Sequence, residues 1–478
     1  MHAFVTKPTS KILAVSTIVA SMFSTASAFD IKYNGWLEAF GKGGFNNQAI
    51  DADKGIYPTD SFLNVVGSLG FDGNLLPKDT ENQSLKYGFN VTGGSMILDS
   101  TSKGFPLGPD SVNNEYVGNW AGYNQNLGPK DGTNRHLYVV NNAYLDYTYG
   151  DFDTSPFSFQ FKGGRYLSSA EYMSGYTQGF EAAMKFKFSD SQSLKLWWYS
   201  SYGRAFAFGQ WLIDFYSPQG YMTGADGKSG QFANYGIHAF KAIYSFGGLD
   251  ITPYIYFSPG TYTAPAFRVE YDTNKGFDGT GFRSRTFANI LLPIYGDDTW
   301  VGKYRWGSIV DKYTQSLLIQ QQFDYNNYNF GLGVYKNFGH ANARIGTTGN
   351  PWMIDFWTAS SYDIGRSISD MIGKDAITPY LFVGGTHFAN KLWWQILGRW
   401  TDAERSQEHS VALNLKYQID ERLSIGGKIE YFSDTTKAGY KVGWANESGS
   451  NGNTAPQSGT PKNVADRSHA FLWIHYDI

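Results

Sequence analysis

The last ten residues of the chain, His469–Ile478, constrain its fold more than any other segment. Apolar side chains occupy alternate positions there: Ala470, Leu472, Ile474, Tyr476 and Ile478. A period of two is typical of a β-strand with one apolar face and does not fit an amphipathic helix. Because this strand runs to the last residue, we expect it to close a membrane β-barrel by pairing with the first strand, which leaves no strand edge in lipid.

The beginning of the chain has the pattern of a secretory signal peptide. Lys7 and Lys11 precede a short apolar run, and a cleavage site of the A-x-A form ends at Ala28. The apolar run is shorter than the ~20 residues that a membrane-spanning helix needs. We therefore expect residues 1–28 to be a cleaved signal peptide and residues 29–478 to be one outer membrane β-barrel domain.

The composition agrees with a barrel. Aromatic residues make up 17% of the chain, glycine accounts for 55 of 478 residues, and the mean hydropathy is −0.36. After the signal peptide, no segment approaches the ~18 consecutive apolar residues of a spanning helix. Strands that are apolar only on alternate residues, with aromatic girdles at both interfaces, would give this balance. A large secreted β-sandwich or propeller is the alternative that composition leaves open.

Cysteine and charge exclude other classes of function. The chain has no cysteine, which excludes thiol catalysis and cysteine metal sites. Its formal net charge is −3 and it has no basic run, so nothing indicates a nucleic-acid partner. The histidines are scattered without an H-x-x-x-H or H-E-x-x-H spacing. We therefore expect neither an enzyme nor a bound cofactor or metal.

Alternating segments recur along the chain. In one of them Phe157, Phe159 and Phe161 alternate with polar residues. Similar segments begin near Leu85, Ala182, Leu194, Leu392, Val411 and Leu423. Each predicts a strand with one apolar and one polar face.

The lengths of the connections alternate, and this alternation predicts the topology. Short turns occur at 190–192, 247–248, 326–327, 389–390 and 420–421, and long loops at 46–60, 96–135, 166–178, 203–231, 339–375 and 434–468. Short turns on one side and long extracellular loops on the other are typical of membrane barrels. The count is sixteen strands if 259–315 is one loop, and eighteen if that segment contains a further hairpin. Either number leaves a lumen too wide for wall side chains alone to fill.

Residues 163–181 carry a resemblance to a known family. Gly164-Arg165 ends an expected strand, and Phe180-Glu181 opens the next, although Ala182 stands where a glycine would be usual. This stretch resembles the third-loop segment of the OprD-like substrate-specific porins. It looks closer still to the Hof family of Helicobacter outer membrane proteins and the related major porins of campylobacters. The resemblance implies an eighteen-stranded barrel whose third extracellular loop folds into the lumen and narrows it. It also implies diffusion of small charged solutes past basic side chains.

Successive side chains of a strand point to opposite faces, so odd and even positions, which we call the parity of a residue, separate the lumen from the lipid side. This parity selects candidate pore-lining residues. The polar face of the expected strands carries Glu181, Lys185, Lys187, Lys195, Arg399, Lys416 and Lys428, with Lys86, Lys162 and Glu430 beside them. One interpretation is a basic ladder that guides anionic groups. The other is a polar wall whose charges are simply solvated.

Arg165 does not fit this pattern. It shares the parity of Phe157, Phe159 and Phe161, which would point it at lipid and cost ~2–4 kcal/mol near the bilayer midplane. Either the strand ends before Arg165, or a bulge at Gly163-Gly164 reverses its register. Arg165 is then a candidate for a strand-end ion pair or for the constriction.

Glu171 lies in the expected constriction loop with Tyr172 and Tyr176. An acidic loop that faces basic wall residues would create a transverse field across a pore. An exposed loop charge is the simpler alternative.

The last strand adds one requirement, because Phe471 and Trp473 would face the lumen. They need cover from an inward-folded loop or from the segment 29–36.

These patterns predict a channel in the outer membrane of a Gram-negative bacterium. We expect passive diffusion of small hydrophilic or charged solutes, with carboxylates and amino acids as candidates. The expected partners are outer membrane lipids, these solutes and the barrel-assembly machinery, with a monomer and a homotrimer equally open. The alternative is a surface barrel that acts as an adhesin, binding host ligands through loops 96–135 and 434–468.

Overall fold

The structure is a computed structural model of the chain. It describes residues 30–478 except 50, 52–53, 55, 57, 78–79, 101–137, 219, 223–231, 297–300, 303, 306–307, 359–368 and 441–457. The expected signal peptide, residues 1–28, lies outside the described residues.

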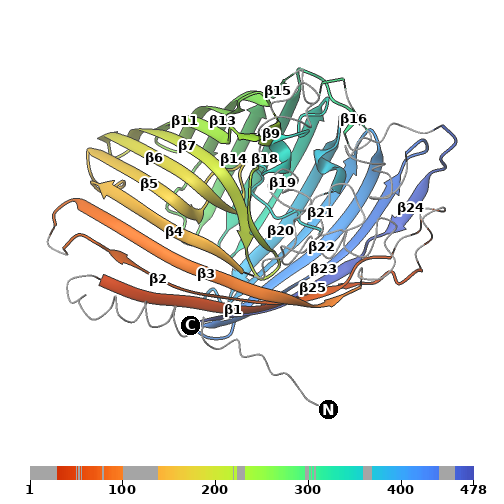
Figure 1. Cartoon of the computed structure of the whole chain (residues 1–478), viewed down its shortest axis with the longest axis horizontal. Coiled ribbons are helices and arrows are strands. Elements are labelled where there is room, and N and C mark those ends of the chain that lie inside the picture. Colours follow the sequence, from red (N-terminus) through yellow and green to blue (C-terminus); the bar gives the residue numbers. More distant parts are fainter. Residues whose placement is uncertain are drawn as a thin grey trace, which may run out of the picture.

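Eighteen long antiparallel strands form a closed barrel (Figure 1). In order around the wall they are β1 (Asp30–Gly44), β2 (Phe62–Asn74), β3 (Gln83–Asp99), β4 (Tyr138–Tyr149), β5 (Phe157–Leu167), β6 (Tyr176–Ser189), β7 (Gln192–Ala207), β11 (Ile237–Phe246), β12 (Leu249–Ser258), β13 (Tyr262–Asp272), β14 (Phe282–Leu291), β18 (Gln315–Tyr325), β19 (Tyr328–Phe338), β20 (Ile377–His387), β21 (Leu392–Asp402), β22 (Ser406–Gln418), β23 (Leu423–Thr436) and β25 (His469–Asp477). The last strand pairs with the first from Trp36↔Asp477 to Gly44↔His469, which closes the wall. No helix in the described part of the chain is long and apolar enough to span a membrane.

Short elements lie in the connections at the end of the barrel that carries the long loops, the expected extracellular end. They are β8 (Leu212–Tyr216), β9 (Gly220–Met222), β10 (Phe232–Asn234), β15 (Ile294–Tyr295), β16 (Tyr304–Arg305), β17 (Ser308–Ile309), the 3₁₀ turns η3 (Ile345–Thr347) and η4 (Ser369–Ile372), and β24 (Asn463–Asp466).

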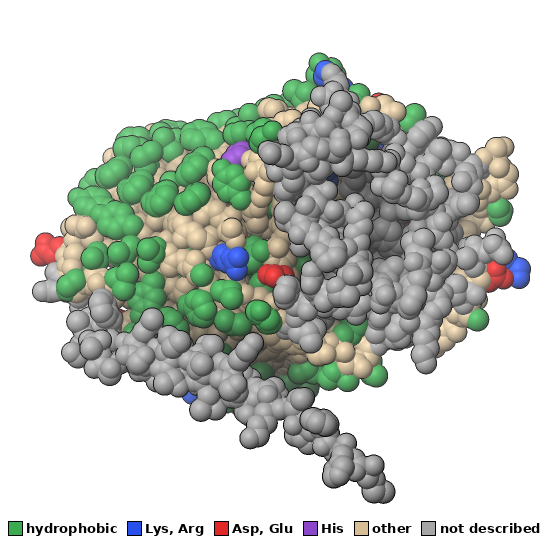
Figure 2. All heavy atoms as spheres, in the orientation of Figure 1, with side chains coloured by type: hydrophobic (Ala, Val, Ile, Leu, Met, Phe, Trp, Pro, Cys, Tyr) green, Lys and Arg blue, Asp and Glu red, His purple; other side chains and the backbone are tan. Residues whose placement is uncertain are grey.

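The alternation in sequence becomes an apolar outer surface and a more polar lumen. In β25, Leu472, Ile474 and Tyr476 are exposed on the outside, whereas His469 and Phe471 are buried inside. This confirms the orientation predicted for the last strand. Hydrophobic side chains cover much of the outer face seen in Figure 2, where charged side chains are few. Such a surface is what a hydrocarbon environment requires of a barrel.

The strand count of eighteen is confirmed and the count of sixteen is wrong. Segment 259–315 contains the hairpin β13–β14, which pairs from Ala266↔Leu291 to Asp272↔Arg285. The expected short turns are all present. Two connections at the extracellular end, 259–261 and 403–405, are also short, which the rule of alternating lengths does not predict. Both join strands whose ladders continue almost to the turn.

Three of the long connections fold into the barrel. We call residues 168–175 loop 3, residues 339–376 loop 7, and residues 204–216, the end of β7 with β8, the β7–β8 hairpin. The tip of this hairpin crosses the lumen, where Asn64 of β2 donates a 2.9 Å hydrogen bond from Nδ2 to the carbonyl of Gln210. Gly209 at the tip lies against β1, because an added Cβ would lie 1.8 Å from the carboxylate of Glu38, and that side chain would have to move to make room.

Each inward segment contributes to a buried apolar cluster on the wall, and loop 7 reaches all three clusters. Loop 3 contributes Tyr172 and Met173 against the inner faces of β6, β7 and β11–β14. Loop 7 contributes Phe356 and Met371 against the sector from β14 to β21. The β7–β8 hairpin contributes Leu212 to a cluster with β1, β2, β4 and β25. The lumen is therefore narrowed by three segments, of which the sequence predicts only loop 3.

The cover required by the last strand is present. Trp357 of loop 7 stacks on Phe471 with ring centroids 4.7 Å apart, and Phe40 of β1 lies 5.4 Å from the same ring. Trp473 stacks on Phe40 at 6.0 Å. An inward-folded loop and the first strand together bury these aromatic side chains.

We predict that Phe471→Ala destabilises the barrel by about 3–5 kcal/mol, because the substitution leaves a cavity among packed rings. Leu472→Ala, one residue along on the outer face, is the matched control and should have a much smaller effect. Urea unfolding of both variants in phospholipid vesicles measures the difference. Equal losses would contradict the burial of Phe471.

Candidate functional site in the barrel lumen

Glu171 fastens loop 3 to the wall. Its carboxylate accepts from Lys241 of β11, forms a 2.7 Å ion pair with Arg268 of β13, and accepts a 3.0 Å hydrogen bond from the Tyr256 hydroxyl. Burial alone would raise the pKa of Glu171, but the positive charges of Lys241 and Arg268 outweigh it and hold that pKa at about 2. The acidic loop residue therefore meets basic wall residues in direct ion pairs.

A second set of contacts joins loop 3 to loop 7. The Ser174 backbone N–H donates to the carbonyl of Thr348 at 2.9 Å, and the Thr348 hydroxyl donates to the carbonyl of Tyr172 at 2.7 Å. The Tyr172 ring meets the Tyr256 ring edge-on at 5.1 Å. Loop 3 is thus held on one side by the wall and on the other by loop 7.

The lysines predicted on β6 and β7 lie in the lumen near its periplasmic end. Lys185 donates to the carbonyl of Phe152 at 2.5 Å, and the Lys195 ammonium lies 5.5 Å from the centre of the Phe152 ring. Lys187 pairs with Asp190 at 3.0 Å. The β4–β5 turn that carries Phe152 therefore occupies part of the space between these lysines.

Glu181 lies deeper in the same sector. Its carboxylate accepts hydrogen bonds from the Ser169 hydroxyl at 2.8 Å and from the Trp197 indole N–H at 2.7 Å. Glu181 thus holds a loop 3 residue and a wall residue together.

The basic residues predicted on the opposite wall differ in accessibility. Arg399 forms a 2.5 Å ion pair with Glu408, and both side chains are buried. Lys428 forms a buried 2.7 Å pair with Glu430 and also donates to the carbonyl of Trp357 in loop 7. Lys416 is exposed.

Arg165 lies in the last pair of the β4–β5 ladder, towards the end of the barrel that carries the long loops. The strand does not end before it, since β5 runs to Leu167, and the pairing with β4 and β6 passes Gly163 and Gly164 without a register shift. The Arg165 guanidinium lies 4.4 Å from the centre of the Phe215 ring in β8. Its Nε donates to the side chain of Gln178 at 2.9 Å.

The most important partners of Glu171 are missed by sequence reasoning. Lys241 faces the lumen from β11, which is not among the alternating segments identified in the sequence. Arg268 faces the lumen from β13, in the segment 259–315 where the strand count left a hairpin open. The same hairpin carries two further ion pairs, Arg283–Asp272 and Arg285–Glu270. The signal that could have revealed them is the alternation of charged and apolar residues between Phe267 and Tyr271.

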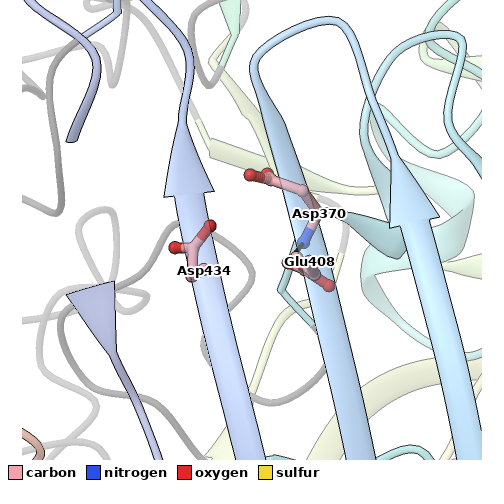
Figure 3. A group of neighbouring side chains, drawn as sticks. All are labelled: Asp370, Glu408 and Asp434. Atoms are coloured by element: carbon pink, nitrogen blue, oxygen red, sulfur yellow. Dashed lines mark hydrogen bonds between the residues drawn. The ribbon is translucent and has the colours of Figure 1, made fainter. Parts of the chain in front are cut away.

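A cluster of carboxylates joins loop 7 to the wall. Figure 3 shows Asp370 of η4 near Glu408 of β22 and Asp434 of β23, with potential ligand atoms within 4.8 Å of one another. The Asp370 backbone N–H donates to Glu408 at 2.8 Å, and Arg405 lies 3.5 Å from Asp370. With Arg399 already paired to Glu408, the cluster is an ion-pair network that fixes η4.

Comparison with known proteins assigns the class of protein. The chain belongs to the family described as "Putative outer membrane protein", whose model matches residues 16–478. No curated protein sequence matches it. The protein is therefore an outer membrane β-barrel protein.

Solved structures share its fold. OccAB4 of Acinetobacter baumannii has a TM-score of 0.57 at 10% identity, with 95% of this chain and 99% of that chain covered. The outer membrane protein OpdK of Pseudomonas aeruginosa has a TM-score of 0.54 at 8% identity, covering 94% and 98%. OpdK has also been solved with vanillate, at a TM-score of 0.53, 8% identity and coverage of 94% and 98%. The family assignment and the shared fold confirm the resemblance carried by residues 163–181.

We predict that Glu171→Gln loosens loop 3, because Lys241 and Arg268 lose their negative partner. Removing one partner of a fully buried ion pair costs about 3–5 kcal/mol, and the loss here should be smaller because the Glu171 side chain is 22% exposed. The expected result is a lower urea midpoint and a larger open-channel conductance. Glu181→Gln is the matched control, since an amide oxygen can still accept from Ser169 and Trp197. An unchanged conductance in Glu171→Gln would contradict the proposal that Glu171 holds loop 3 against the wall.

The low pKa of Glu171 also predicts a pH dependence. Its ordinary value is 4.5 and its value in the folded chain is about 2, so its contribution to stability is fully present above pH 4.5 and is lost as the pH falls towards 2. The conductance should therefore be constant from pH 7 to about pH 4.5 and change below that range. A titration of single-channel conductance measures this, and Glu171→Gln should lack the transition. A transition centred near neutral pH would contradict the assignment.

Proposed function

We propose that this protein is a passive outer membrane channel for small hydrophilic or charged solutes. The observation that carries the proposal is a closed barrel of eighteen strands whose charged inner wall is narrowed by inward-folded segments. A barrel of this size encloses a lumen that its wall side chains alone do not fill. Loop 3 and the β7–β8 hairpin form the proposed constriction.

The accessible charges support a role in solute selection. Lys86 and Lys416 are exposed on the lumenal parity of β3 and β22. Lys162 is partly exposed, with its ammonium 3.8 Å from Asp146. By contrast, Arg399 and Lys428 are engaged with buried carboxylates. We infer that the first group meets solutes and that the second braces the wall.

The basic residues that remain accessible in the lumen favour solutes with a carboxylate, such as organic acids and amino acids. A mobile anion can approach an exposed ammonium, while Lys185, Lys187 and Lys195 add positive potential towards the periplasmic end. Vanillate, present in the OpdK structure, is a ligand of this type. Transport of this kind includes no chemical step, so we propose neither a catalytic residue nor a cofactor.

The adhesin alternative depends on loops 96–135 and 434–468. Most of both falls outside the described residues, at 101–137 and 441–457. No contact in the described part of the chain favours it over the channel. We also infer that residues 1–28 are removed on export and that the barrel-assembly machinery inserts the mature chain.

We predict single-channel conductance steps with a preference for anions when the purified protein is inserted into planar bilayers. Reversal potentials in a salt gradient measure the preference. Replacing both accessible lysines, Lys86→Gln with Lys416→Gln, should shift the reversal potential towards cation selectivity because two lumenal charges are removed.

The matched control retains the charge, as Lys86→Arg with Lys416→Arg, and should behave like the parent protein. The absence of conductance steps would overturn the channel. Cation preference in the parent protein would overturn only the role of the lysines.

A further inference from the structure

The barrel wall is interrupted between β4 and β5. The β3–β4 ladder continues to Gly93↔Tyr138, and the β5–β6 ladder continues to Leu167↔Tyr176. The β4–β5 ladder between them stops at Ala143↔Arg165. Within the described strands, residues 139–142 of β4 therefore form no ladder pair with β5.

Gly164 marks the point where β5 leaves the wall. It adopts a φ of +122°, and an added Cβ would lie 2.2 Å from the carbonyl oxygen of Ala143. Only glycine tolerates both conditions readily. Beyond this point the neighbouring strands turn into the lumen, since Tyr176 of β6 and Leu212 of the hairpin pack in the lumenal cluster with Phe40.

The position of the break along the strands is estimated from the length of β4. Ala143 is six residues along β4 from Tyr149, which lies at the periplasmic end of the strand. At ~3.3 Å per residue and a tilt of ~40°, this places the start of the break about 15 Å above that end. An apolar band ~25 Å tall that begins at that end would include the start of the break.

The open edge of β4 is covered from the lumenal side. β8 lies against β4, and Phe215 of β8 supports the Arg165 guanidinium at 4.4 Å. Arg165 reaches across the break, where its Nη1 donates at 3.4 Å to the carbonyl of Val140. An open strand edge is not tolerated in hydrocarbon unless its polar groups are satisfied, so Arg165 and β8 act as a plug.

The chemistry of this plug indicates its ligand. Arg165 keeps the outward parity of β5 and is partly exposed, in a region where an unpaired cation is costly. Phe215, whose ring supports the guanidinium, packs against a buried apolar cluster that includes Val139, with Met96 and Tyr176 beside it. A cation beside an apolar cluster fits an anionic head group joined to a hydrocarbon chain.

We propose that the break between β4 and β5 is a lateral portal. A single-chain amphiphile with a carboxylate or phosphate head group passes through it between the outer leaflet and the lumen. Arg165 receives the head group, and Phe215 moves with the β7–β8 hairpin to admit the chain. This activity goes beyond the diffusion of hydrophilic solutes proposed above and does not depend on it.

The test measures uptake of radiolabelled dodecanoate by Gram-negative cells that lack their own fatty-acid channel and express the full chain. We expect uptake well above that of cells without the protein, reduced at least fivefold by Arg165→Ala and retained within about twofold by Arg165→Lys. Lys336→Ala is the matched control, because it removes an outward basic residue on β19, where the ladders on both sides are intact. Heat-modifiable migration on gels confirms that each variant is folded.

A second measurement reports access directly. Purified protein in vesicles is photolabelled with a diazirine derivative of dodecanoate, and the labelled residues are mapped by mass spectrometry. We expect labels at residues 138–142 and at Phe215, with competition by unlabelled dodecanoate or dodecyl phosphate but not by dodecanol or acetate. The stronger competitor of the two anions identifies the head group.

Several outcomes would overturn the portal. They are dodecanoate uptake no higher than in cells without the protein, equal uptake by Arg165→Ala and the parent, and labels spread evenly around the outer belt. Effective competition by dodecanol would overturn the role of Arg165. Conductance steps without dodecanoate uptake would reject the portal alone, whereas uptake without steps would reject the hydrophilic channel alone.

Discussion

The structure depends on one constraint, which is that backbone hydrogen-bonding groups cannot remain unpaired in hydrocarbon. Pairing β1 with β25 removes both edges of the sheet at once. Closure then requires apolar side chains outside and leaves the other face for polar and charged ones. The break between β4 and β5 is informative because the ladder stops at Ala143↔Arg165 and because Arg165 donates to the carbonyl of Val140 beyond that point.

Much of the fold follows from local pattern. Alternation and turn residues identify most strands, and they orient β25 correctly down to the burial of Phe471. The hairpin β13–β14 stays ambiguous in sequence because its alternating segment, Phe267–Tyr271, is short and stands within a long polar stretch. The short turn at 403–405 is missed because no feature of its composition separates it from a strand interior.

The candidate site is less accessible to sequence reasoning. Parity places lysines on the lumenal face, but it does not show which ones are neutralised. Glu171 meets Lys241 and Arg268 only because the loop folds back onto strands 70 and more residues away. The crossing of the lumen by the β7–β8 hairpin leaves no local signature, since Gly209 is one glycine among 55.

The bonds between loop 3 and Thr348 bear on the order of assembly. Loop 3 is synthesised early, yet its partner in loop 7 belongs to a connection between strands of the last third of the chain. The wall contacts of loop 3 need only strands up to β13, whereas its bonds to loop 7 need the chain as far as Thr348. Loop 3 can therefore reach the wall first, and the bonds that join it to loop 7 belong to a late step of biogenesis.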